Sequence, residues 1–238
     1  MASRVDAHGG KRTPGIGSGL RAALTDFYFN SGRLVGANVI WGIAAVGLAL
    51  VWLVWPLGAL ILSPLLAFPT VGIFRLAARI VRRDGSVSFG DAFTAYREFA
   101  RPTLLLGLGS VVAGLVLGTN AVVGLAQAEP VGWVIGTLAA WGLAVVWCGL
   151  IVAWPVVVDP ARADESLRRR LRLVGLLLLA QAGRFALLGV VVALIAIVST
   201  ILVVALLTVG VSYIALLACR VVYPTADAFE SATAVPSA

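Results

Sequence analysis

Four long stretches without a charged residue are the feature that most constrains how this chain can fold. They cover residues 34–74, 102–128, 130–158 and 185–219, and are 41, 27, 29 and 35 residues long. An α-helix needs about 20 apolar residues to cross the ~30 Å hydrocarbon core of a bilayer. The two middle runs are therefore long enough for one crossing each. The two outer runs are each long enough for a hairpin of two crossings.

The composition agrees with a membrane protein and excludes other classes. Apolar residues make up 61% of the chain and the mean hydropathy is +1.02, so a water-soluble fold would expose large apolar patches. A transmembrane barrel would alternate apolar and polar residues, whereas these runs are continuously apolar. We therefore expect an all-α, polytopic transmembrane helical bundle. Six spans are favoured, and five are the alternative because the last run lacks a clear turn.

The basic residues lie almost entirely between the charge-free runs and predict the topology. Of the 18, five precede the first run, six lie in 75–101, six lie in 159–184, and Arg220 follows the last run. With a hairpin in each outer run, all four basic segments fall on one side, which the positive-inside rule identifies as the cytoplasm. We attribute the net charge of +7 to this topology and not to nucleic-acid binding.

The two ends of the chain are polar and contain no apolar run. Residues 1–30 lack the apolar core of a signal peptide, so we expect a flexible cytoplasmic tail there. A single transmembrane helical domain is expected over 31–223, followed by a second flexible cytoplasmic tail over 224–238. Both termini are thus predicted to be cytoplasmic.

Prolines and tryptophans refine the expected spans. Pro64 and Pro69 predict a kinked second span, because proline interrupts helical hydrogen bonding. Trp133 and Trp154 bracket the fourth span about 31 Å apart at 1.5 Å per residue, which is the spacing of aromatic belts at the two membrane interfaces. In the last run, two short spans are expected to meet near Ser199–Thr200.

Two segments between the spans predict amphipathic helices, over 86–101 and 164–182. Helices of this kind lie on the inner leaflet, with apolar residues toward lipid and arginines toward anionic headgroups. The predicted apolar stripes are Phe89, Phe93, Tyr96 and Phe99 or Ala100 in the first, and Leu167, Leu171, Val174 and Leu178 in the second.

These interfacial helices have two interpretations. They anchor the chain and set its topology, or they form a docking surface for a cytoplasmic partner. The candidate residues for contact with lipid or with a partner are Arg82, Arg83, Arg97, Arg101, Arg168, Arg169 and Arg172.

The spans themselves contain few polar groups. The only histidine is His8, and no metal-binding motif or pair of carboxylates occurs in a span, so we expect no catalytic site, no cofactor and no metal. Asn38 and Asn120 are the candidate intramembrane polar contacts, either as bonds between helices or in a small polar cavity. Glycines spaced four apart, at Gly114 and Gly118 and at Gly132 and Gly136, permit close approach of the third and fourth spans.

Several local motifs carry a resemblance to a known family. They are Phe27-Tyr28-Phe29, Asn38-Val39-Ile40-Trp41, Phe68-Pro69-Thr70, the loop from Arg79 to Gly85, and the aromatic-basic segment with Phe89, Phe93, Tyr96-Arg97-Glu98-Phe99 and Arg101. In these motifs the chain resembles the YesL-like family of uncharacterised bacterial integral membrane proteins, best over about 25–125. The resemblance implies a bacterial plasma membrane protein associated with carbohydrate uptake, and it supplies no catalytic residues.

Two functions fit these observations, and a third has less support. The first is a non-enzymatic accessory protein of a carbohydrate uptake system, with a transporter subunit as partner. The alternative is a permease or channel-like transporter in its own right, although the Glu-Ala-Ala loop of ATP-driven importers is missing. A membrane enzyme is disfavoured because titratable groups are absent from the spans.

Overall fold

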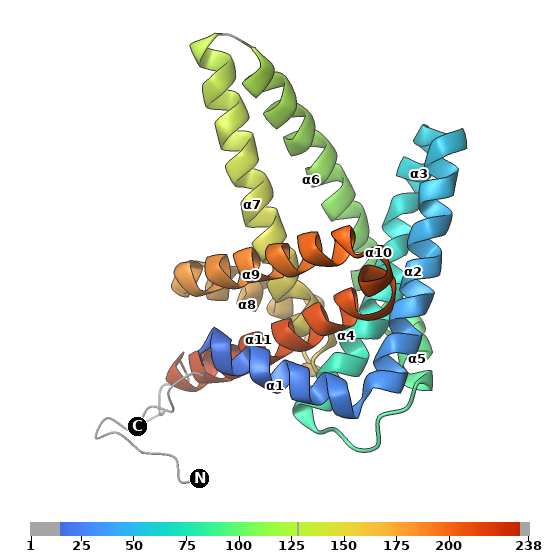
Figure 1. Cartoon of the computed structure of the whole chain (residues 1–238). Helices are drawn as coiled ribbons and strands as arrows, with labels where there is room; N and C mark the ends of the chain where they lie inside the picture. The colour runs from blue at the N-terminus through green and yellow to red at the C-terminus, as the bar shows by residue number, and fades with distance from the viewer. Residues whose placement is uncertain (1–14, 128, 234–238) are drawn as a thin grey trace.

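The computed structural model describes residues 15–127 and 129–233, and its regular structure is helical throughout this part of the chain (Figure 1). Within these residues, six helical stretches are long and apolar enough to cross a membrane. They are Ser31–Val54, Pro56–Arg82, Ala100–Ala126, Pro130–Val158, Ala182–Ile201 and Leu206–Thr233. The prediction of a polytopic helical bundle is therefore confirmed.

The first charge-free run forms a helical hairpin. Its rising helix is α2 (Ser31–Val54), and the returning stretch consists of α3 (Pro56–Leu62), η1 (Ser63–Leu66) and α4 (Ala67–Arg82). The 3-10 turn η1 interrupts the second span at Pro64, as the sequence predicts, because proline cannot donate the backbone hydrogen bond that an α-helix requires.

The second hairpin pairs α6 (Ala100–Ala126) with α7 (Pro130–Val158). Glycines let their backbones touch: a Cβ built on Gly124 would lie 2.6 Å from the amide nitrogen of Gly136 and 2.7 Å from the carbonyl oxygen of Gly132. Gly114 and Gly118 have nothing within 4 Å of such a Cβ. Close approach therefore involves the predicted pair on α7, but a different glycine on α6.

The last charge-free run contains α9 (Ala182–Ile201), a break at Leu202, α10 (Val203–Ala205), the π-helical turn η3 (Leu206–Gly210) and α11 (Val211–Thr233). The break lies just after the predicted position at Ser199–Thr200. Figure 1 shows that α9 and α11 run across the direction of α6 and α7. Six crossings of one membrane therefore stay a prediction, although six helices have the required length and composition.

The expected N-terminal tail is partly helical. Residues Ile16–Phe29 form α1, which packs along α11, with Gly19 and Ala23 buried. The tight contact is possible because Gly19 has no side chain: a Cβ there would lie 3.1 Å from the side chain of Val221. Asp26 of α1 also forms an ion pair of 2.5 Å with Arg220. The predicted flexible tail over 1–30 is therefore wrong for 16–29, and residues 1–14 lie outside the described part.

The expected C-terminal tail is also largely helical. Helix α11 continues through Pro224 to Thr233, which corrects the predicted flexible tail over 224–233. The extension is held by its own acids, because Asp227 and Glu230 pair with arginines of other helices. Residues 234–238 lie outside the described part.

The two predicted amphipathic segments contain α5 (Gly90–Glu98) and α8 (Leu167–Ala180), which are shorter than expected. In α5, Ala92 and Ala95 are buried while Phe93 is 45% exposed. The buried face of α8 differs from the predicted stripe as well, since its buried residues are Arg170, Leu173, Val174 and Leu177. Tertiary contacts with α4 and α7, and not lipid alone, select these faces.

The core lies where α4, the C-terminal half of α7 and α11 meet. There Trp154 is only 8% exposed and stacks on Phe74, with ring centroids 6.1 Å apart. Trp154 therefore packs in the core and does not form an aromatic belt, whereas Trp133 at the other end of α7 is 56% exposed. Away from the core the two hairpins diverge in Figure 1, and their far ends are largely exposed.

Candidate functional site

The C-terminal end of α7 is the point where polar side chains from four helices converge. The last four carbonyl groups of any α-helix lack partners within the helix. Here Tyr223 of α11 donates to the Pro155 carbonyl at 3.1 Å, Arg170 of α8 donates to the Val157 carbonyl, and Arg75 of α4 donates to the Val158 carbonyl at 3.0 Å. Two cations thus face the negative end of the helix dipole, which stabilises them there.

The next residue, Asp159, places a fully buried carboxylate at this end of the core. Its Oδ1 accepts from the Ala161 amide at 3.1 Å and so caps the short 3-10 helix η2 (Pro160–Arg162). Arg82, the last residue of α4, grips the same carboxylate with two bonds, Nε to Oδ1 at 3.0 Å and Nη2 to Oδ2 at 2.6 Å. Such bidentate pairs are among the stronger hydrogen bonds in proteins.

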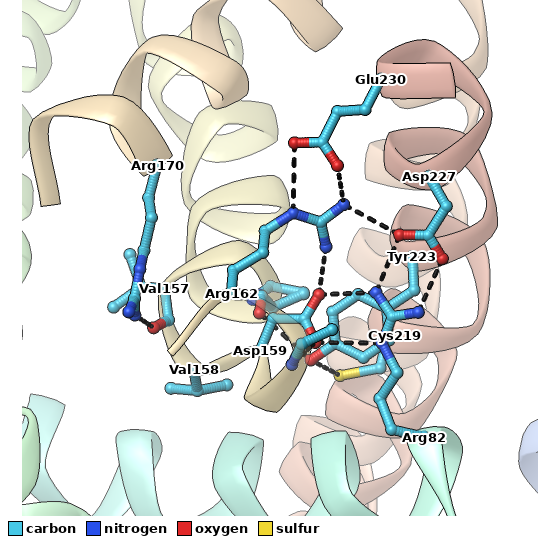
Figure 2. A network of polar contacts seen from close by, with 12 residues as sticks. Arg82, Val157, Val158, Asp159, Arg162, Arg170, Cys219, Tyr223, Asp227 and Glu230 are labelled. Carbon is cyan, nitrogen blue, oxygen red and sulfur yellow. Dashed lines mark hydrogen bonds and ion pairs between the residues drawn. The ribbon is translucent and has the colours of Figure 1, made fainter. Parts of the chain in front are cut away.

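A second arginine extends the contact to the end of α11 (Figure 2). Arg162, which is 4% exposed, pairs with Asp159, donates to Asp227 at 2.8 Å and donates to Glu230 at 2.6 Å. Arg82 also reaches Asp227, with Nη1 to Oδ2 at 2.6 Å. We call Arg82, Asp159, Arg162, Asp227 and Glu230 the charge network.

Burial and charge act against each other at the two buried arginines outside the spans. Burial alone would lower the pKa of Arg162, but its bonds to Glu230 and Asp227 and the charge of Asp159 outweigh burial and raise the pKa. Burial lowers the pKa of Arg170, whose two bonds go to backbone carbonyls. The guanidinium of Arg162 is thus held firmly in its charged form.

An aromatic ring packs against one arginine of the charge network. The guanidinium of Arg82 lies 4.4 Å from the ring centroid of Tyr223, a cation–π contact. The hydroxyl of Tyr223 also accepts from the thiol of Cys219 at 3.6 Å. Cys219 and Cys148 are both free, and Cys219 is buried.

The charge network is suited to a structural role, the connection of helices. Each carboxylate of the network is bound by at least one arginine, and Asp159 and Asp227 are bound by both. Among the described residues, no group of three or more His, Cys, Asp and Glu side chains could hold a metal ion. The network therefore ties α4, η2 and α11 together at one end of the molecule.

The seven predicted contact arginines fall into different environments. Arg82 belongs to the charge network, and Arg169 makes a 3.4 Å ion pair with Glu165 while remaining 73% exposed. The other five are exposed and form no ion pair within residues 15–127 and 129–233, namely Arg83, Arg97, Arg101, Arg168 and Arg172.

Sequence reasoning missed most of the charge network. Asp159, Arg162, Asp227 and Glu230 were not among the predicted site residues. One signal was present, since Asp159 directly follows the apolar run of α7 and lies among arginines. The spacing of Asp227 and Glu230, three residues apart, places two acids on one helix face. The partners themselves lie far apart in the chain.

The two predicted asparagines make different contacts. Asn38 of α2 is fully buried, donates to the Leu206 carbonyl at 2.7 Å and accepts from the Ser212 amide at 2.8 Å. It thus bridges the first residue of the π-helical turn η3 and the second residue of α11. Asn120 is exposed and donates to the Val116 carbonyl of its own helix at 2.7 Å.

A small hollow with a mostly apolar wall and a few polar groups lies between α2, η1, α4, α6 and α7. Its volume is about 200 Å³, and three hydroxyls and two indoles line it, those of Ser63, Thr70, Ser110, Trp41 and Trp154. The hydroxyls donate to backbone carbonyls three or four residues earlier in the chain, and the indole of Trp41 donates to Thr70 at 3.1 Å. The oxygen atoms of Ser63 and Ser110 remain as acceptors toward the hollow.

No model of a known protein family matches the sequence, and neither a curated protein nor a solved structure shows significant similarity to the chain.

Proposed function

We propose that this protein is a non-enzymatic integral membrane protein that acts as an accessory subunit of a transport system. The observation that carries the proposal is the division of its arginines into two sets. One set is used internally around the end of α7, where Arg75, Arg82, Arg162 and Arg170 satisfy buried carboxylates and carbonyls.

The second set has exposed side chains and no carboxylate partner within the described ranges. Arg97 and Arg101 lie at the α5–α6 junction, and Arg168 and Arg172 lie one turn apart on α8. Exposed arginines on ordered helices suit contact with an acidic partner surface or with anionic headgroups. The internal set also holds α8 in position, because Arg170 joins the first turn of α8 to the end of α7.

The setting of this function is proposed from the family resemblance. The YesL-like family points to the bacterial plasma membrane and to a carbohydrate uptake system, so the proposed partner is a transporter subunit. The basic segments would then face the cytoplasm with both chain termini, as the positive-inside rule expects. Anchoring of these arginines to lipid headgroups is compatible with docking to a partner, because the headgroups lie at the same depth as the cytoplasmic surface of a membrane-bound partner.

Co-purification from native membranes tests the accessory function. Tagged wild-type protein is expected to retain a permease or ATPase subunit, and the Arg168→Gln/Arg172→Gln variant is expected to lose most of it. An Arg21→Gln/Thr25→Ala variant, changed on the exposed side of α1, serves as the control. Purification of the wild type alone, with unchanged sugar uptake in a deletion strain, would overturn the proposal.

The hollow between α2, η1, α4, α6 and α7 favours a second candidate, a permease in its own right. Indole faces and hydroxyl oxygens are groups that bind polyols, and the hollow lies beside the kink at η1, where a helix can bend. Reconstituted liposomes test this candidate by uptake of labelled sugars. A Ser63→Val/Ser110→Val variant should lose flux if the hollow is part of the path. Absence of flux for the wild type would remove this candidate.

A further inference from the structure

A second hollow, separate from the charge network, lies between the α1–α2 junction and the loop that joins α4 to α5. Its volume is about 350 Å³. Three arginines and an asparagine contribute to its wall, Arg33, Arg79, Arg83 and Asn30, together with the loop residues Gly85 and Ser86. None of the acidic residues in the described part of the chain lines it.

The three arginines differ in whether a carboxylate of the protein pairs with them. Arg79 is already paired with two carboxylates, those of Asp91 at 2.6 Å and Asp84 at 3.5 Å. Arg83 is exposed and makes no ion pair with another described residue. Arg33 is also exposed, and its only partner in that part of the chain is the side-chain oxygen of Asn30 at 3.5 Å. Two guanidinium groups are therefore free to bind an anion in the hollow.

The backbone conformation of Arg83 is unusual and supports a role for its side chain. Helix α4 ends in a Schellman motif, in which the Arg83 amide donates to the Ile80 carbonyl at 3.2 Å and the Asp84 amide donates to the Arg79 carbonyl at 3.0 Å. The motif requires a left-handed residue, and Arg83 adopts it with φ of 54°. Glycine is the usual residue there because a side chain is strained in this region. An arginine kept at a strained position points to a function for its charge.

The start of α2 adds positive potential at the same place. Asn30 precedes this 24-residue helix and makes no side-chain cap with it. The amide groups of the first turn of a helix carry partial positive charge and favour anions. Arg33 lies in this first turn, so its guanidinium and the helix terminus act on the same side of the hollow.

We infer that this hollow binds a phosphate-bearing anion through Arg33, Arg83 and the N-terminal end of α2. Guanidinium groups bind phosphate oxygens in bidentate geometry and stay charged at any physiological pH. Basic pockets between membrane helices on the cytoplasmic side bind anionic lipid headgroups, and soluble phosphates carry the same chemical group. This inference does not rest on the accessory function proposed above.

Two binding experiments separate the two sources of phosphate. In the lipid arm, protein in nanodiscs of phosphatidylcholine with added phosphatidylglycerol is released and analysed by native mass spectrometry for retained lipid. In the soluble arm, calorimetry measures binding of inorganic phosphate and pyrophosphate to protein in pure phosphatidylcholine nanodiscs. Both arms compare the wild type with Arg33→Gln/Arg83→Gln, with each of the two single variants, and with the control Arg21→Gln, which loses an exposed charge on α1 outside the hollow.

We expect the wild type to bind in one arm, and that arm identifies the source. The Arg33→Gln/Arg83→Gln variant should bind about tenfold or more weakly, because it loses two charge-assisted contacts. The control should bind like the wild type. Equal weakening in Arg33→Gln/Arg83→Gln and in the control would show non-specific attraction to charge and would overturn the inference, as would absence of binding in both arms.

Arg83→Gly provides a variant that cannot fail through misfolding of the motif. Glycine relieves the left-handed strain, so the melting temperature should rise while binding weakens in the same arm. A variant that is more stable and still binds like the wild type would contradict a role for Arg83.

Discussion

Arg82 and Asp159 lie 77 residues apart in the chain and meet in a bidentate ion pair, with the Asp159 carboxylate fully buried. The pair joins the last residue of α4 to the first residue after α7. Asp227 of α11 binds the same arginine, so three apolar helices are fixed together by one guanidinium. A buried charge of this kind is strongly destabilising once its partner is removed.

Asp159→Asn should therefore lower the stability by about 3–5 kcal/mol, because buried Arg162 and half-buried Arg82 are left with one carboxylate fewer between them. Thermal unfolding in detergent micelles measures the change. Asp164→Asn is the matched control, since Asp164 is an exposed acid of the same loop with no ion pair among the described residues. Equal melting temperatures for the two variants would show that the network contributes little.

The buried amide of Asn38 leads to a second prediction. Asn38→Leu keeps the size of the side chain but leaves the Leu206 carbonyl and the Ser212 amide without their partner at η3. Unpaired buried backbone groups cost about 1–3 kcal/mol, so the variant should melt at a lower temperature. Asn120→Leu should be neutral, because Asn120 is exposed and bonds only within its own helix. A neutral Asn38→Leu would mean that the π-helical turn satisfies these groups in another way.

The close approach of α6 and α7 leads to a third prediction. In Gly124→Ala, the new methyl group would lie 2.6 Å from the Gly136 amide nitrogen, so the helices must separate. We expect a loss of about 1–3 kcal/mol from this overpacking. Gly118→Ala should be neutral or stabilising, because nothing lies near its Cβ and alanine favours helices over glycine by about 1 kcal/mol. Thermal unfolding of both variants compares them directly, and equal stability would contradict the packing.

Much of the fold could be predicted because charge-free length is a local property of the sequence. The six apolar helices follow from it. The kink at Pro64 follows from another local property, the missing amide hydrogen of proline. The face of α8 could not be predicted, because Arg170 is buried by its bonds to the Val157 and Ala163 carbonyls. Arg170 is the last of three consecutive arginines, which look exposed in the sequence, and only the free end of α7 makes its burial favourable.

The helix α1 was missed for a similar reason. Gly15, Gly17 and Gly19 suggest flexibility when they are considered alone. In the structure Gly19 lies against Val221, and Asp26 pairs with Arg220 194 residues away. The charge network likewise consists of partners 65 to 145 residues apart, apart from the pair of Asp159 and Arg162. Such sites depend on tertiary packing that a single sequence does not display.

The fourth prediction concerns the membrane topology, because α9 and α11 run across the direction of α6 and α7 (Figure 1). The positive-inside rule predicts that positions 83, 168 and 233 lie on the cytoplasmic side, and positions 57, 129 and 202 are expected on the outer side if six helices cross the membrane. All six positions are exposed in the structure, so single cysteines there can be labelled after Cys148 and Cys219 are changed to alanine. Position 222 is unsuitable, because Val222 is fully buried.

An impermeant maleimide added to intact cells should label positions 57, 129 and 202 and leave positions 83, 168 and 233 unlabelled until the cells are opened. Positions 57 and 129 serve as internal references, because position 57 lies at the start of α3, next to the turn after α2, and position 129 lies in the turn between α6 and α7. Position 202 decides between the alternatives, since it lies at the turn between α9 and α11. If it is protected in intact cells while the references react, these two helices do not form a transmembrane hairpin. The core around α7 would then lie nearer the cytoplasmic surface than a six-span arrangement requires.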